Sequence, residues 1–208
     1  MEIKDNVALV TGGASGLGRA AVEHIVANGG KAAIVDINEE KANDVIAQLG
    51  DENVIFINTN VMEEDSVKNA LSVVEDKFSK LNFVINCAGT GYGARILGKK
   101  GPHPLDIFKF IIDLNLVGTF NVLRLGSELI DANEPDDKGE KGVIINTASI
   151  GVSSKDLSET FIKKGNFVGI TNCYEAAQKK QEFGGAKLMF ENLLCDGGLI
   201  KDDQSIIN

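Results

Sequence analysis

The chain contains 208 residues, of which 43% are hydrophobic and 25% are charged, and these values predict one globular domain whose core needs no disulfide or metal ion. The formal net charge of −9 disfavours a general nucleic-acid-binding surface, because binding to phosphates requires clustered Lys and Arg side chains. The cysteines, Cys87, Cys173 and Cys195, have no metal-ligand spacing, so we expect no metal site and a reducing compartment.

Short apolar segments alternate with longer helical segments between Met1 and Ser149. The short segments are rich in Val, Ile and Ala, which is typical of fully buried strands. The predicted strands are Asn6–Val10, Lys31–Val35, Val54–Asn58, Phe83–Asn86 and Val143–Asn146, and the predicted helices are Leu17–Asn28, Glu39–Leu49, Glu63–Phe78 and Leu105–Ile130. This alternation predicts an α/β fold, a doubly wound (Rossmann-like) parallel sheet in a single domain.

The longest apolar region, Ile107–Ile130, is interrupted by Lys, Asp, Asn and Arg side chains and is therefore too polar to span a bilayer. We expect a helix that is buried on two sides, in the core or in a subunit interface. The residues before the first predicted strand form neither an apolar signal segment nor a basic presequence, which favours the cytoplasm.

A glycine-rich turn, TGGASGLG from Thr11 to Gly18, joins the first predicted strand to the first predicted helix. Glycines let backbone N–H groups approach a pyrophosphate at the positive end of a helix. The same spacing also suits a plain strand-to-helix turn. The cofactor-binding residues predicted here are Gly12, Ser15, Gly16, Leu17 and Gly18.

Asp36, at the end of the second predicted strand, favours a dinucleotide site. A carboxylate at this place accepts hydrogen bonds from both ribose hydroxyls and repels a 2′-phosphate, so we predict NAD and not NADP. The alternative is a turn residue at a strand end.

Further candidates follow the third and fourth predicted strands, where open α/β sheets bind ligands. Asn60 and Val61 follow the third strand, and Cys87, Ala88 and Gly89 follow the fourth. Small residues permit a flat ring to approach closely, although a tight turn would require them too. We interpret Cys87 as a small buried residue and not as a nucleophile, because no His lies near it in the sequence.

Together, TGGASGLG, Asp36, NCAG at Asn86–Gly89, Asn115 within LNLVGTF, and NTAS at Asn146–Ser149 resemble the short-chain dehydrogenase/reductase family. The resemblance covers Met1 to about Ser149 and is strongest to members that act on 3-hydroxyacyl-CoA or hydroxysteroids. It implies NAD-dependent oxidation of a secondary alcohol. The family usually has an aspartate where this chain has Asn60, so we expect a weaker contact with adenine, made by the amide oxygen of Asn60 and the backbone N–H of Val61.

The resemblance also implies the catalytic residues. Ser149 would hydrogen-bond the substrate oxygen, Asn115 would anchor a water in a proton relay, and Lys164 would hold the nicotinamide ribose. Asn115 has an alternative role as a kink or polar contact in a long helix, and Ser149 as a strand-end cap.

The family's acid/base is a tyrosine four residues before the lysine, and this position holds Thr160, whose hydroxyl is too weak an acid. Tyr174 has no lysine four residues later, and no proline follows Pro135 to form the family's Pro-Gly turn over the nicotinamide. We therefore expect a well-matched core over residues 1–149 and a divergent segment over residues 150–208 with incomplete C-terminal strands.

Two functions follow from this pattern. The first is an NAD-dependent oxidoreductase of lipid metabolism, acting on an acyl-CoA or steroid-like small molecule with impaired catalysis. The second is a catalytically inactive NAD-binding scaffold or dimerisation module. The resemblance also implies a homo-oligomer built through the long helices, a mitochondrial location and a scaffold role in tRNA processing.

Overall fold

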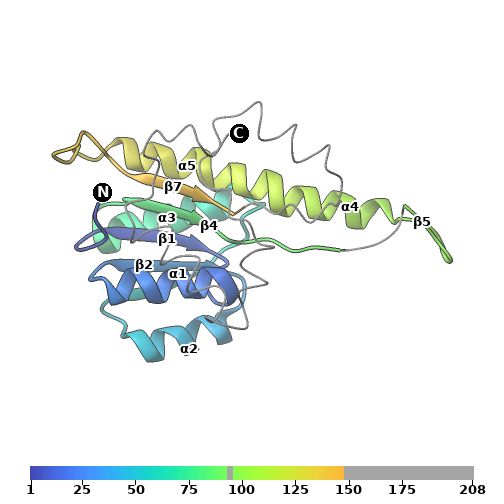
Figure 1. The fold of residues 1–208 in the computed structure, drawn as a ribbon, viewed down its shortest axis with the longest axis horizontal. Helices are drawn as coiled ribbons and strands as arrows, with labels where there is room; N and C mark the ends of the chain where they lie inside the picture. The colour runs from blue at the N-terminus through green and yellow to red at the C-terminus, as the bar shows by residue number, and fades with distance from the viewer. Residues whose placement is uncertain (93–95, 148–208) are drawn as a thin grey trace, which may run out of the picture. The chain divides into compact units, whose positions relative to one another are not determined.

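The computed structural model describes residues 1–92 and 96–147. In this part of the chain, a parallel sheet has the strand order β3-β2-β1-β4-β7 (Figure 1). Its strands are β1 (Val7–Thr11), β2 (Lys31–Asp36), β3 (Val54–Asn58), β4 (Phe83–Asn86) and β7 (Val143–Asn146). Each predicted strand agrees with the structure to within one residue at either end, and the predicted doubly wound parallel sheet is confirmed. The C-terminal strands predicted to be incomplete lie outside the described residues.

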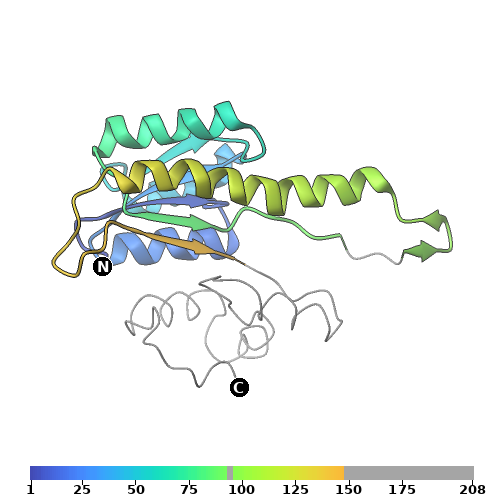
Figure 2. The same cartoon turned by 90° about the horizontal axis from the view of Figure 1, so that it is seen from above.

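Helices cover both faces of the sheet. Helices α1 (Gly16–Ala27) and α2 (Glu39–Leu49) lie on one face, and α3 (Glu64–Phe78) and α5 (Thr119–Asp131) lie on the other (Figures 1 and 2). The central strands are therefore buried on both sides, and every residue of β1 is buried. This two-sided burial explains why the strands have continuous and not alternating apolar sequences.

The predicted long helix is continuous from α4 (Leu105–Ile112) through a π-helical turn, η1 (Asp113–Gly118), into α5. No residue of α4 is buried within the chain, so α4 does not lie in the core, and burial in a subunit interface stays a prediction. Helix α4 extends past the end of the sheet (Figure 2), next to a short hairpin of β5 (Leu97–Gly98) and β6 (Gly101–Pro102) that was not predicted. Apolar composition indicated burial correctly only for α5, which packs against β4, β7 and α3.

Helices α3 and α5 are linked by charged side chains. The Nη2 atom of Arg124 lies 2.6 Å from Oε2 of Glu64, which also pairs with Lys68 one turn along α3. Hydrogen bonds from Lys68 and Arg124 lower the pKa of the Glu64 carboxyl below its usual value. These groups are exposed to water, so the pairs position the two helices more than they stabilise the fold.

The chain divides into two compact units, Met1–Asn146 and Thr147–Asn208, and the described residues belong almost entirely to the first. The single domain expected over residues 1–208 therefore stays a prediction. Among the described residues, no helix is both long and apolar enough to cross a membrane. Residues 1–92 and 96–147 also contain no group of three or more His, Cys, Asp or Glu side chains placed to hold a metal ion.

Candidate cofactor-binding site

The predicted cofactor-binding residues that the structure describes lie at the carboxyl ends of the parallel strands. Strand β1 lies between β2 and β4. The chain continues from β1 to β2 and β3 on one side, and then crosses to β4 and β7 on the other side of β1. Such a switch in strand order opens a crevice at the carboxyl ends, where doubly wound sheets bind nucleotides. The glycine turn follows β1, Asp36 ends β2, Asn60 and Val61 follow β3, and Cys87, Ala88 and Gly89 follow β4.

Three glycines give the turn after β1 its shape. Gly12 has a φ of +64°, and a Cβ atom there would lie 2.9 Å from the backbone nitrogen of Ala88. A Cβ atom on Gly18 would lie 2.3 Å from the carbonyl oxygen of Gly12. Gly16 differs, because its φ is +55° but no atom lies within 4 Å of a Cβ built on it. Two glycines therefore permit close packing, and the third borders open space.

The start of α1 suits an anionic group. Ser15 is its N-cap residue and makes no side-chain capping hydrogen bond, and the first turn has no acidic residue. Ser15 and Gly16 are exposed, and Leu17 is half-buried. Backbone N–H groups at a helix start carry a partial positive charge, so the residues present fit the pyrophosphate of a dinucleotide.

Substitutions at two glycines of this turn test how closely each one is packed. We expect Gly18→Ala to lower the free energy of unfolding by about 1–3 kcal/mol, because its Cβ atom would collide with the Gly12 carbonyl. Gly16→Ala meets no neighbour and costs only about 1 kcal/mol for its positive φ. Urea denaturation of both variants checks the difference, and an equally stable Gly18→Ala variant would contradict the described packing.

Asp36 is fixed against the glycine turn. Its Oδ2 atom accepts a hydrogen bond from the backbone N–H of Ala14 at 3.1 Å, and its Oδ1 atom accepts one from the N–H of Asn38 at 3.0 Å. The residue is half-buried. Because a carboxylate has about four acceptor positions, the group retains lone pairs for two further donors, such as ribose hydroxyls.

Thr11 is a site residue that sequence reasoning missed. Its Oγ1 atom accepts hydrogen bonds from the backbone N–H groups of Cys87 and Ala88, both at 3.0 Å. In the neighbouring pair of strands, Nδ2 of Asn86 donates a hydrogen bond to Oδ1 of Asn146 at 2.9 Å, which joins the ends of β4 and β7. A threonine directly after an apolar strand was the available signal. Cys87 is half-buried, and so less buried than expected.

Asn115 lies in the π-helical turn and holds the loop after β4. Its Nδ2 atom donates to the carbonyl oxygen of Thr90 at 2.8 Å, and its Oδ1 atom accepts from the N–H of Thr90 at 2.9 Å. The same Oδ1 atom lies 3.1 Å from the position of a Cβ atom on Gly89. The structure thus contains the polar contact considered as the alternative role, and the anchoring of a relay water stays a prediction.

The loop after β3 is held by its own side chains. Asn60 donates from Nδ2 to Oε1 of Glu63 at 2.8 Å and accepts at Oδ1 from the N–H of Met62 at 3.1 Å. The side chain of Val61 is buried in the core. The amide oxygen expected to contact adenine therefore already accepts one hydrogen bond and has one lone pair left.

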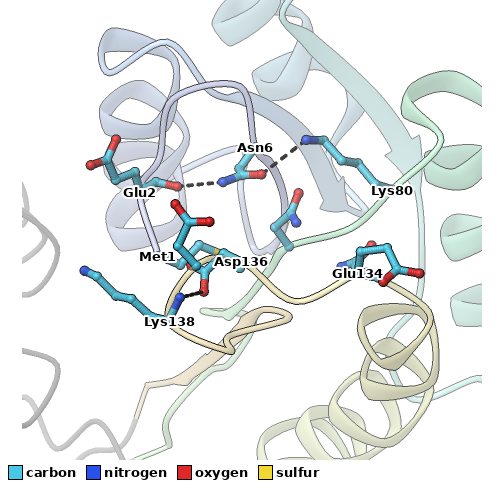
Figure 3. Close-up of a pocket in the computed structure, with 10 residues that line it drawn as sticks. Met1, Glu2, Asn6, Lys80, Glu134, Asp136 and Lys138 are labelled. Atoms are coloured by element: carbon cyan, nitrogen blue, oxygen red, sulfur yellow. Dashed lines mark hydrogen bonds between the residues drawn. The ribbon is translucent and has the colours of Figure 1, made fainter.

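Four residues of the sequence-based interpretation, Ser149, Thr160, Lys164 and Tyr174, lie outside the described residues. A pocket within the described part lies at the amino ends of the strands, whereas the glycine turn follows the carboxyl end of β1 (Figure 3 shows the pocket). It is bordered by residues that precede β1, β4 and β7, and Lys80 there donates to Oδ1 of Asn6 at 3.2 Å. This pocket contains none of the predicted site residues.

The short chain dehydrogenase family model matches residues 6–161, and the chain belongs to this family. It is similar to the 3-hydroxyacyl-CoA dehydrogenase type-2 of Drosophila melanogaster, with 41% identity over 81% of this chain and 68% of the relative. The human protein of the same name is 38% identical over 81% of this chain and 66% of its own length. The ipsdienol dehydrogenase of Ips pini is 33% identical over 94% of this chain and 77% of the relative.

A solved structure supports the same relationship. The crystal structure of 3-hydroxyacyl-CoA dehydrogenase type-2 from Mycobacterium avium has a TM-score of 0.65 and 38% identity, and it covers 71% of this chain. This chain spans 57% of that structure and about two thirds of the curated type-2 relatives.

Proposed function

We propose that the chain is an NAD-dependent oxidoreductase that acts on a secondary alcohol or ketone, such as a 3-hydroxyacyl-CoA or a hydroxysteroid. The observation that carries this proposal is the contact between Asp36 and Ala14, because it places a carboxylate beside a glycine turn at a helix start. The names of the Drosophila and human relatives support a 3-hydroxyacyl-CoA as the substrate. An NADH titration of the Asp36→Ala variant, described in the Discussion, tests the proposal.

The proposal assigns a role to each part of the site. The backbone of the glycine turn would hold the pyrophosphate, and Asp36 would accept hydrogen bonds from the adenosine ribose. Asn60 and Val61 would border the adenine, and Cys87, Ala88 and Gly89 would border the nicotinamide side. NAD supplies a hydride acceptor when it is bound. For the chemical step we propose Ser149 at the substrate oxygen, Lys164 at the nicotinamide ribose and Asn115 in the proton relay.

A catalytically inactive NAD-binding scaffold is the second candidate function. It is favoured by Thr160, which occupies the position where the family resemblance places a tyrosine. A threonine hydroxyl cannot give or take a proton efficiently near neutral pH. The scaffold would bind NAD and associate with other chains without hydride transfer.

We also propose a homo-oligomer that forms through the α4–η1 face. This face is defined by the exposed apolar side chains of Leu105, Phe108, Phe110, Ile112, Leu116 and Val117, of which Leu105 at 64% and Leu116 at 62% are the most exposed. Apolar patches of this kind mark protein interfaces. A mitochondrial location and a scaffold role in tRNA processing rest on the family resemblance alone.

The α4–η1 face gives a test of assembly. We expect a dimer or tetramer at micromolar concentration in sedimentation velocity, and a shift to monomer for Leu116→Asp, because a buried carboxylate at the interface is costly. Asp106→Asn on α4 is the matched control and should leave the assembly unchanged. A monomeric unmodified chain would contradict this part of the proposal.

A further inference from the structure

Asn121 of α5 reaches the loop that follows β3. Its Nδ2 atom donates a hydrogen bond to the carbonyl oxygen of Val61 at 3.0 Å, and its Oδ1 atom accepts one from Nη2 of Arg124 at 2.9 Å. The residue is only 5% exposed. Both ends of a buried amide are therefore used, and one of them holds the backbone of a predicted cofactor-binding residue.

A second contact joins the same two segments. A Cβ atom on Gly118, at the end of the π-helical turn, would lie 2.8 Å from Cγ2 of Val61. The side chain of Val61 is 5% exposed and belongs to the main core cluster. The helix thus approaches Val61 at its side chain through Gly118 and at its carbonyl through Asn121.

Other contacts hold the loop from its remaining sides. The N–H of Thr59 donates to the carbonyl oxygen of Asp36 at 3.0 Å, and the N–H of Asn60 donates to Oγ of Ser66 on α3 at 3.0 Å. The loop is therefore attached to β2, to α3 and, through Asn121, to α5. Asn121 lies in α5, which is continuous with η1 and α4, so its hydrogen bond connects the loop to the long helix.

We propose that Asn121 is a positioning residue for the adenine end of the cofactor, acting through the Val61 carbonyl. This inference rests on the proposed function, in which Asn60 and Val61 border the adenine. Among the described residues, every buried side-chain nitrogen and oxygen has a hydrogen-bond partner. Loss of the Asn121 donor would leave the Val61 carbonyl without this partner in a buried place, and the loop would move to regain one.

The variant Asn121→Asp tests this role. Aspartate has nearly the same size and keeps an oxygen for Arg124, but it cannot donate to the Val61 carbonyl and repels it. We expect the dissociation constants of NADH and of ADP-ribose to rise equally, roughly tenfold, while that of reduced nicotinamide mononucleotide, which lacks adenine, stays unchanged. NADH and the mononucleotide are followed by nicotinamide fluorescence, and ADP-ribose by competition with NADH.

Asn133→Asp is the matched control. Asn133 also uses Nδ2 to hold loop carbonyls, those of Leu81 at 2.6 Å and Lys141 at 2.9 Å, but these loops precede β4 and β7 at the amino ends of the strands. We expect this variant to lose stability in urea without a change in ADP-ribose affinity. Gly118→Ala, which presses on Val61 through the second contact, should reproduce the adenine-specific loss if Asn121→Asp fails to fold.

Three results would overturn the inference. Unchanged ADP-ribose affinity in the Asn121 variant would show that the Val61 carbonyl does not position adenine. An equal loss for the mononucleotide would show a general destabilisation. If the unmodified chain bound neither NADH nor ADP-ribose, the proposed function would fail and this inference with it, which the titration of the unmodified chain distinguishes from the first two results.

Discussion

Asp36→Ala is expected to weaken NADH binding by about a hundredfold. Two hydrogen bonds from ribose hydroxyls to a carboxylate contribute roughly 1.5 kcal/mol each, and their combined loss of about 3 kcal/mol corresponds to this factor. The substitution also removes the contacts from Ala14 and Asn38, so the glycine turn loses part of its support. Fluorescence titration with NADH measures the change.

A second nucleotide separates ribose recognition from damage to the turn. The carboxylate repels the 2′-phosphate of NADPH, so its removal should weaken NADPH binding much less than NADH binding, or even strengthen it. Damage to the turn would instead weaken both nucleotides alike. Asp44→Ala, on the exposed side of α2, is the control and should bind NADH normally. Unchanged NADH affinity in Asp36→Ala would refute the assigned ribose contact.

Reduction of acetoacetyl-CoA by NADH is expected to be about 10²–10⁴-fold slower than in the Drosophila relative assayed in parallel. This factor is the usual contribution of a positioned general acid, and Thr160 cannot supply the proton. Steady-state loss of NADH absorbance measures the rate, and the NADH titration confirms that the cofactor is bound during the assay.

Tyr174→Phe tests whether the hydroxyl of Tyr174 acts as the general acid in place of the missing family tyrosine. We expect the variant to retain whatever slow rate the unmodified chain has, because Gln178 and not a lysine stands four residues later. A normal rate in the unmodified chain that disappears in Tyr174→Phe would identify Tyr174 as the acid. A normal rate in both proteins would mean that the proton comes from a group other than Thr160 and Tyr174.

The sheet and the glycine turn could be predicted because their signals are local. Strands buried on both faces have continuous runs of Val, Ile and Ala, and the turn needs glycine at Gly12 and Gly18 because backbone atoms lie too close for a Cβ atom. Asp36 could be found because its place at the end of β2 follows directly from the strand pattern.

The polar contacts of the site could not be predicted in the same way. Thr11 with Cys87, and Asn121 with Val61, join residues far apart in the sequence, and neither pair has a local pattern. Apolar composition could not distinguish the core from a subunit interface for α4, because it does not say whether the covering surface belongs to the same chain. The π-helical turn has no signal in the periodicity, since it changes the register within one continuous apolar segment.

The π-helical turn η1 fixes the angle between the two halves of the long helix. Each residue of an α-helix turns the chain by about 100°, so loss of a single residue between Asp113 and Gly118 would rotate α4 by about that amount against α5. Asn115 would then swing away from Thr90 while Asn121 stayed at Val61. Insertions and deletions in this short stretch would therefore reorient α4 and release the loop after β4 from Asn115, while the contact of Asn121 with the loop after β3 stayed in place.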